Sequence, residues 1–206
     1  MPQKKNILLL GAGGHARSCI DVIEEQGLYR IAGLICVQAE RGTTVLGYPV
    51  LGTDADLPDL LKQHDAGLVT IGQIKTVEPR MRLFAQLLES GRALPPIVSP
   101  RAHVSRHAVV GDGSIVLHGA IVNAGARVGR NCIINSMALV EHDATVEDHC
   151  HISTGARLNS SVVIGEGSFV GSGVAIKQGV RIGKHCVVGM GLAVRHDCPD
   201  GTVLRG

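Results

Sequence analysis

Aromatic residues and runs of one charge are scarce in this sequence. Of its 206 residues only four are aromatic (Tyr29, Tyr48, Phe84 and Phe169), and there is no tryptophan. Stacking of nucleobases on aromatic side chains is therefore not expected. The formal net charge is only +2, and no basic run is present. Both observations argue against a nucleic-acid-binding protein.

Long hydrophobic stretches are missing as well. The apolar run at residues 7–10 is too short for a signal peptide or a membrane span. We therefore expect a soluble, cytoplasmic protein. The hydrophobic fraction of 45% is high enough for a real core, and the length fits one large domain or two small ones.

A repeat of six residues dominates the second half of the sequence. From Val98 to Val194, every sixth residue is Ile, Leu or Val, in seventeen consecutive positions without an insertion. A second series, four residues later, holds only small or apolar residues from Ala102 to Cys198. Neither a helix nor a plain strand has this period, whereas hexapeptide repeats mark a parallel β-helix. We predict a three-sided solenoid over residues 97–206, with about 18 residues in each coil.

Glycine and cysteine have structural interpretations within this repeat. Glycines such as Gly111 and Gly165 directly follow the aliphatic residue, where we expect the backbone to turn. Four of the six cysteines fall in the small interior series: Cys132, Cys150, Cys186 and Cys198. We interpret them as buried, reduced thiols. The His-Cys-His sequence at 149–151 is not predicted to bind a metal, because the cysteine should point inward and its neighbours outward.

The first half alternates short apolar runs with helical periodicity. The predicted elements are strands at 5–10, 31–37, within 47–52 and at 68–71, and helices at about 14–26, 54–64 and 77–90. Asp54 is a candidate N-cap of the second helix. This alternation indicates a small open α/β sheet in a domain of residues 1–94, and Pro95-Pro96 forms the boundary.

Gly11, Gly13 and Ala16 match the Gly-x-Gly-x-x-Gly/Ala motif between a strand and a helix. Such glycines let a pyrophosphate approach the helix N-terminus. The acidic residue that would hold the ribose of NAD is missing, since Cys-Val-Gln stands at 36–38. A lone glycine motif is weak, and a tight turn between strand and helix is the alternative. We favour diphosphate binding, because the ionisable His15 follows the turn directly.

Several segments resemble a known family. Hexapeptides such as Val-Gly-Asp-Gly-Ser-Ile at 110–115 look like those of the hexapeptide-repeat acyltransferases. The segments Gly-Ala-Gly-Gly-His (11–15), Gly-x-Pro-Val-Leu-Gly (47–52) and Ile-Gly (71–72) are similar to the sugar O-/N-acyltransferases of the sialic acid O-acetyltransferase type. This group includes the N-acetyltransferases of UDP-bacillosamine precursors and of GDP-perosamine. The resemblance covers almost the whole chain.

This resemblance implies a fold and a set of ligands. The implied fold is a Rossmann-like α/β domain followed by a left-handed parallel β-helix that assembles as a homotrimer. Acetyl-CoA is the implied co-substrate, without a metal, and the implied pathway is cell-surface polysaccharide biosynthesis. Gly13, Gly14, His15 and Gly72 match the residues that hold a nucleotide-linked amino sugar or sialic acid-type substrate. UDP, GDP and CMP stay open as the nucleotide, and amino and hydroxyl groups as the acceptor.

The catalytic residues are implied by the segment Asn-x-x-x-x-Val-Glu-His-Asp at 135–143, which matches the family motif. In the family, the histidine at the position of His142 is the general base, and the acid at the position of Asp143 raises its basicity by a hydrogen bond to the far ring nitrogen. A nearby carboxylate also stabilises imidazolium and fixes the tautomer. Glu141 is the competing acid, but an interval of 18 residues stacks it with two asparagines, which favours a corner role. We expect direct attack on the thioester.

The coenzyme contacts of the family match His151, Ser172 and Met190. Ser172 and Met190 are 18 residues apart, so they stack on one edge of the solenoid, as a coenzyme arm parallel to the axis requires. His151 has the alternative interpretation of a plain surface residue.

Three other functions are compatible with parts of the sequence. Carbonic anhydrases of the γ type share the hexapeptide solenoid and bind zinc through three histidines. His149 and His185 have the 36-residue spacing of two of them, but Met190 stands where the third histidine would be. A non-catalytic scaffold that binds sugar nucleotides stays open. NAD-linked chemistry is disfavoured by the missing acidic residue.

Overall fold

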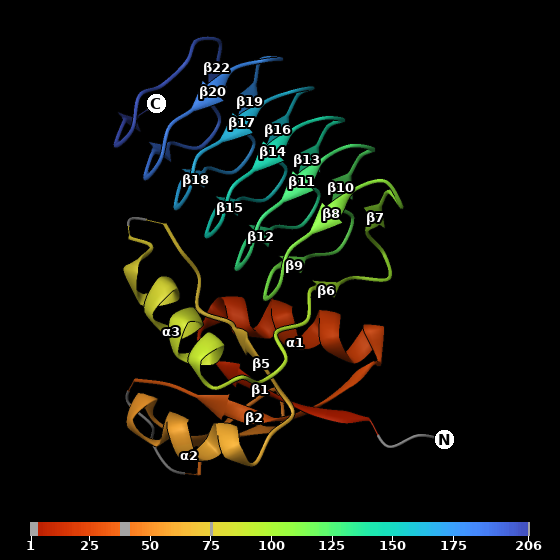
Figure 1. The fold of residues 1–206 in the computed structure, drawn as a ribbon, viewed down its shortest axis with the longest axis vertical. Coiled ribbons are helices and arrows are strands. Elements are labelled where there is room, and N and C mark those ends of the chain that lie inside the picture. The colour runs from red at the N-terminus through yellow and green to blue at the C-terminus, as the bar shows by residue number, and fades with distance from the viewer. Residues whose placement is uncertain (1–3, 38–41, 75, 206) are drawn as a thin grey trace.

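The structure is a computed structural model that describes residues 4–37, 42–74 and 76–205. It has two parts, an α/β sheet with its helices and a column of stacked coils (Figure 1). The N-terminal, red-to-yellow part lies at one end and side of the column, and the chain climbs coil by coil to the C-terminus. Gln38, part of the segment that lacks the NAD-type acid, lies outside the described residues.

The α/β part is built around a five-stranded sheet with the order β3-β4-β2-β1-β5. All pairs in it are parallel except β3 with β4. Its elements are β1 (Lys5–Leu10), α1 (Gly14–Gln26), β2 (Tyr29–Ile35), β3 (Thr44–Val45), β4 (Tyr48–Gly52), the 3-10 helix η1 (Asp54–Asp56), α2 (Leu57–Lys62), β5 (Ala66–Val69) and α3 (Glu78–Glu89). The predicted alternation of strands and helices is thus present, with shifts of a few residues at several ends.

One predicted cap is wrong. The helix expected at 54–64 is a 3-10 turn followed by α2, and its N-cap is Thr53 rather than Asp54. Thr53 has an extended backbone, and its N–H donates to the Asp56 carboxylate over 2.8 Å. Its side chain in turn caps the backbone of Asp56, so this reciprocal pair satisfies donors that a helix start leaves free.

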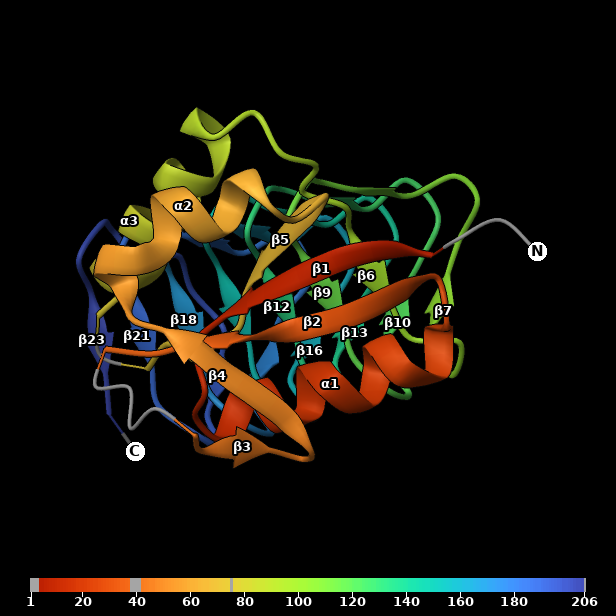
Figure 2. The ribbon, with the colours of Figure 1, turned by 90° about the horizontal axis from the view of Figure 1, so that it is seen from below.

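Helix α1 joins the two parts. It buries an apolar stripe on the inner face of the sheet: Ala16, Cys19, Ile20, Val22 and Ile23. Gly27, with φ of 67°, ends it and donates its N–H to the Ile23 carbonyl, as expected for a left-handed C-terminal cap. The same apolar cluster continues into the column through Ile97, Ile115, Leu117 and Ile133. Helix α1 therefore lies between the sheet and the column (Figure 1), and the view from below shows it beside β2 with the coils behind it (Figure 2).

Three parallel sheets form the sides of the column. The sheet that faces the α/β part, called here the domain-facing sheet, contains β6 (Ile97–Val98), β9 (Ile115–Val116), β12 (Ile133–Ile134), β15 (His151–Ile152), β18 (Phe169–Val170), β21 (Val187–Val188) and β23 (Val203–Leu204). The second sheet contains β7 (His103–Val104), β10 (Ile121–Val122), β13 (Leu139–Val140), β16 (Arg157–Leu158), β19 (Ala175–Ile176) and β22 (Ala193–Val194). The third sheet contains β8 (Val109–Val110), β11 (Arg127–Val128), β14 (Thr145–Val146), β17 (Val163–Ile164) and β20 (Arg181–Ile182).

Successive coils repeat at the predicted interval. Ile121 pairs with Leu139 and Leu139 with Arg157, each 18 residues apart. The aliphatic series and the small series fill one continuous buried core. We name the turns between the domain-facing and second sheets the first edge, those between the second and third sheets the second edge, and those that return to the domain-facing sheet the third edge. This is the left-handed parallel β-helix that the resemblance implied.

The glycines that follow the aliphatic residue have a different purpose from the one predicted. A Cβ added at Gly111 would lie 2.6 Å from the Gly129 carbonyl oxygen, and one at Gly165 would lie 2.5 Å from the Gly183 carbonyl carbon. These positions therefore need glycine for space, because the backbone of the next coil lies against them. The left-handed turn conformation occurs two residues later, for example at Gly113 (φ 66°).

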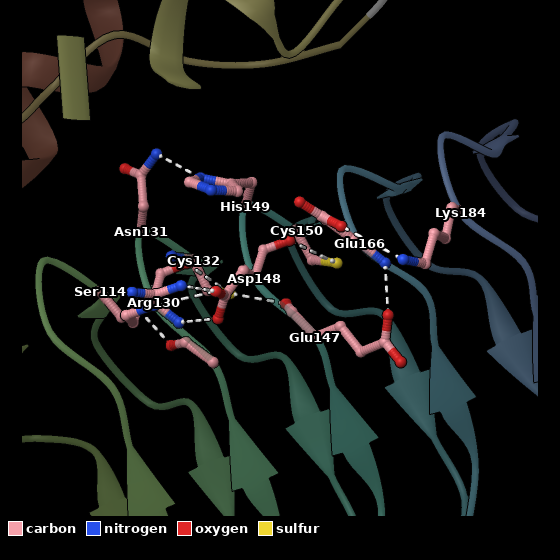
Figure 3. A network of polar contacts seen from close by, with 11 residues as sticks. Ser114, Arg130, Asn131, Cys132, Glu147, Asp148, His149, Cys150, Glu166 and Lys184 are labelled. Carbon is pink, nitrogen blue, oxygen red and sulfur yellow. Dashed lines mark hydrogen bonds and ion pairs between the residues drawn. The ribbon is translucent and has the colours of Figure 1, made fainter. Parts of the chain in front are cut away.

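A row of hydroxyl and thiol groups stabilises the third edge, and Figure 3 shows Ser114, Cys132 and Cys150 from this row. Each side chain donates to a carbonyl of the next coil: Ser114 to Gly129, Cys132 to Glu147, Cys150 to Gly165, Ser168 to Gly183, and Cys186 to Pro199. The small series therefore uses serine or cysteine at this edge because the corner leaves a carbonyl that needs a donor. Outside it, Arg130 pairs with Asp148 over 2.7 Å.

Candidate active site

His142 lies on the second edge, between β13 and β14, with 56% of its side chain exposed. Its Nδ1 atom is 2.8 Å from Oδ2 of Asp143. Since the carboxylate can only accept, Nδ1 carries the proton and Nε2 has a free lone pair. Nε2 is therefore the basic atom of the ring.

Asp143 reaches the imidazole because of its backbone conformation and the space beneath it. Its φ of 60° is left-handed. The residue one coil below is Gly125, where an added Cβ would lie 2.5 Å from Oδ1 of Asp143. The glycine thus leaves room for the carboxylate.

Glu141 stabilises the turn that carries His142. Its Oε2 atom accepts a hydrogen bond from the Asn123 side chain over 3.0 Å and another from the backbone N–H of His142 over 3.0 Å. The stack with Asn123 was predicted from the 18-residue interval. Glu141 therefore fixes the backbone that carries the imidazole, while Asp143 contacts the ring.

Ser160 is a neighbour of His142 that was not predicted from the sequence. Its hydroxyl lies 2.7 Å from Nε2 of His142, and because Nδ1 holds the ring proton, the hydroxyl donates. Ser160 is 18 residues beyond His142 and so occupies the same edge one coil higher. The coil interval that linked Glu141 to Asn123 would have found it.

The glycine turn leads into α1 as predicted, with Gly13 as the N-cap residue. An added Cβ at Gly13 or Gly14 would meet no atom within 4 Å, so the turn has open space in front of it. Gly72 follows β5 at the same end of the sheet, and a Cβ there would be 3.7 Å from Cβ of His15. The four predicted substrate residues thus lie together at the carboxyl ends of β1 and β5, where ligands of open α/β sheets bind.

His15 and His151 meet where this turn faces the column, with ring centroids 6.5 Å apart. Nδ1 of His151 donates to the Gln73 carbonyl over 2.7 Å, and Nε2 accepts from the Asn135 side chain over 3.1 Å. His151 is thus buried and joins the loop after β5 to the column, so it is not a plain surface residue. Nε2 of His15 lies 3.4 Å from Sγ of Cys19.

Both rings are held neutral. Burial, together with the charges of Arg80 and His151, lowers the pKa of His15 to about 3. Burial also lowers the pKa of His151 to about 4, and the bond to the Gln73 carbonyl opposes this shift only in part. Neither imidazole contributes a positive charge near neutral pH, so any anion bound at the turn must rely on backbone N–H groups and other cations.

Ser172 and Met190 lie on the first edge, after β18 and β21. The Ser172 hydroxyl is 2.9 Å from that of Ser153 in the coil below, and Met190 is 75% exposed. The structure thus places the two residues on one edge, and places His142 on another edge of the same chain. Among the residues described, no group of three potential ligands is arranged to hold a metal ion, and no helix is long and apolar enough to cross a membrane.

Comparison with known proteins decides between the candidate families. Residues 6–87 match the PglD N-terminal domain, and residues 161–195 match the hexapeptide repeat of succinyl-transferase. A mutant of perosamine N-acetyltransferase from Caulobacter crescentus, in complex with CoA and GDP-perosamine, is 32% identical with a TM-score of 0.88, covering 96% of this chain and 92% of that one. The chain belongs to the hexapeptide-repeat sugar O-/N-acyltransferases.

Other solved structures agree with this assignment. The acetyltransferase domain of PglB from Neisseria gonorrhoeae FA1090, in complex with acetyl coenzyme A, is 29% identical with a TM-score of 0.86, covering 98% of this chain and 96% of that one. WeeI from Acinetobacter baumannii AYE, at 24% identity and a TM-score of 0.85 over 97% and 96% of the two chains, shares the fold. No match was found among the curated proteins. Family membership confirms the predicted enzyme class, an acetyl-CoA-dependent sugar acetyltransferase.

Proposed function

We propose that this enzyme acetylates an amino or hydroxyl group of a nucleotide-linked sugar, with His142 as the general base. The observation that carries the proposal is the exposed imidazole whose Nδ1 is bound to Asp143 and whose Nε2 already accepts a hydroxyl proton donor, Ser160. An acceptor amine or hydroxyl that replaced the Ser160 hydroxyl would present its proton to the same lone pair. Geometry of this kind suits general-base catalysis.

The proposed reaction has one covalent step. The acceptor nitrogen or oxygen attacks the thioester carbonyl carbon while Nε2 of His142 takes its proton, and the C–S bond then breaks to release the CoA thiolate. Asp143 holds the imidazole in the required tautomer and stabilises the imidazolium that forms. No side chain is acylated, so no covalent enzyme intermediate arises.

The acceptor site is proposed at the glycine turn. Gly13 and Gly14 face open space at the helix N-terminus, with His15 and Gly72 beside them, and backbone N–H groups at such a terminus favour a diphosphate. The relative from Caulobacter crescentus was solved with GDP-perosamine, which supports an amino sugar linked to a nucleoside diphosphate as the substrate class. The proposed division of labour assigns sugar-nucleotide binding to residues 1–94 and transfer to residues 97–206.

A homotrimer is part of the proposal. Ser172 and Met190, the proposed coenzyme contacts, lie on the first edge, whereas His142 lies on the second. Within one chain the column separates these edges, so a thioester held beside Met190 reaches an imidazole only if a second copy supplies it. His151, whose two ring nitrogens are occupied, would shape the floor of the same site. Buried thiols at Cys132, Cys150 and Cys186 fit action in the reducing cytoplasm.

A panel of 4-amino sugar nucleotides and sialic acids, tested with acetyl-CoA by release of free thiol, examines this function. We expect turnover with one nucleotide-linked amino sugar. His142→Ala should retain the fold and lose about 100-fold or more of kcat, as is usual for a general base. His196→Ala is the matched control, since His196 follows β22 on the same edge three coils higher. Absence of acetyl-CoA binding in calorimetry would instead indicate a scaffold.

A further inference from the structure

Among the residues that the structure describes, Arg80 is the largest fully buried side chain, with 1% of its surface exposed. It projects from α3 into the junction between the α/β part and the column. Burial lowers its pKa to about 10, so it stays charged at neutral pH. No carboxylate pairs with it among the described residues. A buried charge without a counter-ion is costly, and this cost needs an explanation.

Neutral oxygen atoms take up most of the guanidinium donors. One terminal nitrogen donates to the carbonyls of Val69 and Ile71, at the end of β5. The other donates to the backbone carbonyl of Asn131 over 3.0 Å and to its side-chain oxygen over 2.8 Å. Asn131, on the third edge of the column, is held in turn by His149 at 2.9 Å (Figure 3). Nε has no hydrogen-bond partner within the described residues.

The bond to the Ile71 carbonyl acts on the next residue as well. The carbonyl of Ile71 and the N–H of Gly72 belong to one planar trans peptide, so they point in opposite directions. The N–H of Gly72 therefore points away from Arg80, and it donates to no acceptor in the part of the chain described. A cation bound to the carbonyl also polarises the peptide and makes this N–H a stronger donor.

The positive charge extends to the glycine turn. Gly72 lies beside His15, and the charge of Arg80 is one cause of the low pKa of both His15 and His151. Since these imidazoles are neutral, Arg80 is a fixed cation whose field reaches the turn. Its own position, beneath the Ile71–Gly72 peptide, keeps it out of direct contact with solvent.

We propose that Arg80 is a positioning residue for the diphosphate of the sugar nucleotide: it holds and polarises the Ile71–Gly72 peptide so that the Gly72 N–H is presented to the anion, and it supplies the countercharge. This inference rests on the proposed sugar-nucleotide site and deepens it. The missing carboxylate is then explained, because the bound diphosphate provides the negative charge that the protein lacks.

Calorimetry with GDP, UDP and acetyl-CoA tests the inference on Arg80→Met and Arg80→Lys. We expect Arg80→Met to weaken the tighter nucleoside diphosphate about tenfold or more and to leave acetyl-CoA binding within twofold. Arg80→Lys keeps the charge but not the fork and should lose less. Arg82→Met is the control, since Arg82 is on the same helix, is 61% exposed and pairs with Asp54. A purely structural residue would lower the melting temperature and leave nucleotide affinity unchanged, which would overturn the proposal.

Hydrogen exchange in the wild-type protein provides a test that does not depend on the variants folding. Exchange of the peptide that contains Gly72 should slow when GDP or UDP binds. If a nucleotide binds and this exchange is unchanged, Arg80 does not act through Gly72 and the inference fails, while the sugar-nucleotide site stands. If wild-type protein binds neither nucleotide, the proposed function itself fails.

Discussion

The hydroxyl of Ser160 lies 2.7 Å from Nε2 of His142, one coil above it on the second edge. Two residues that are 18 positions apart thereby form one unit. The Ser160 hydroxyl occupies the position from which the substrate amine or hydroxyl would give its proton to Nε2. Both ring nitrogens of the proposed base are therefore hydrogen-bonded before substrate binds.

Ser160→Ala tests whether the hydroxyl is only a placeholder. If an acceptor replaces it, we expect kcat to stay within about threefold of wild type, since the lost bond exists only before binding. Steady-state thiol release measures this. A loss as large as that of His142→Ala would place Ser160 in the catalytic machinery.

Asp143→Asn should remove the charge that orients His142 and stabilises its imidazolium. We expect kcat to fall about tenfold or more, with little change in the affinity for acetyl-CoA, because the change affects proton transfer rather than binding. Glu141→Gln is the matched comparison, since Glu141 contacts the backbone N–H of His142 and not its ring. Equal losses in both variants would contradict the separate roles.

Gly165→Ala should destabilise the column strongly. The added methyl group would lie 2.5 Å from a carbonyl carbon of the next coil, and backbone cannot yield as a side-chain end can. We expect a loss of about 3 kcal/mol or more in the free energy of unfolding. Gly155→Ala is the control: its methyl group meets nothing within 4 Å, although φ is 66°, so it should cost about 1–2 kcal/mol. Urea unfolding measures both.

Acid should destabilise the junction between the two parts. The pKa of His15 is about 3 and that of His151 about 4 in the folded protein, against 6.5 when unfolded. Below pH 6.5 the unfolded chain therefore binds protons that the folded chain does not, and stability falls as pH falls from about 6.5 to about 4 for His151 and to about 3 for His15. Each ring contributes up to about 1.4 kcal/mol per pH unit.

His15→Asn removes one of the two groups that take up a proton when the chain unfolds in acid. We expect a flatter dependence of the urea midpoint on pH between 4 and 6.5 in the variant than in the wild type. A slope identical in His15→Asn and the wild type would show that His15 does not oppose protonation in the folded state.

Much of this fold could be predicted from the sequence, because the six-residue repeat is a local pattern with one geometric solution. The interval of 18 residues also placed Glu141 beside Asn123 correctly. The glycines were misread, since the close approach of Gly111 to Gly129 depends on the spacing between coils rather than on the turn. Thr53 was missed as a cap because both it and Asp54 are good N-cap residues.

The polar junction was harder to predict. Arg80 is 51 positions from Asn131 and 11 from Val69, and on α3 it reads as one more exposed cation of an amphipathic helix. Its burial depends on how the helix meets the column, which no periodicity encodes. The hydrogen bond between His151 and the Gln73 carbonyl could not be predicted from the sequence either, because every residue type has a backbone carbonyl.

The uninterrupted register of the coils also constrains how the chain can vary in length. An insertion or deletion of one residue within a strand would exchange the interior and exterior side chains of that strand. The insertion or deletion of one complete coil would only make the column longer or shorter, by about 4.8 Å. Evolution and engineering can therefore alter the length of the column in steps of whole coils, and coils added above Ser160 leave the pair His142 and Ser160 intact.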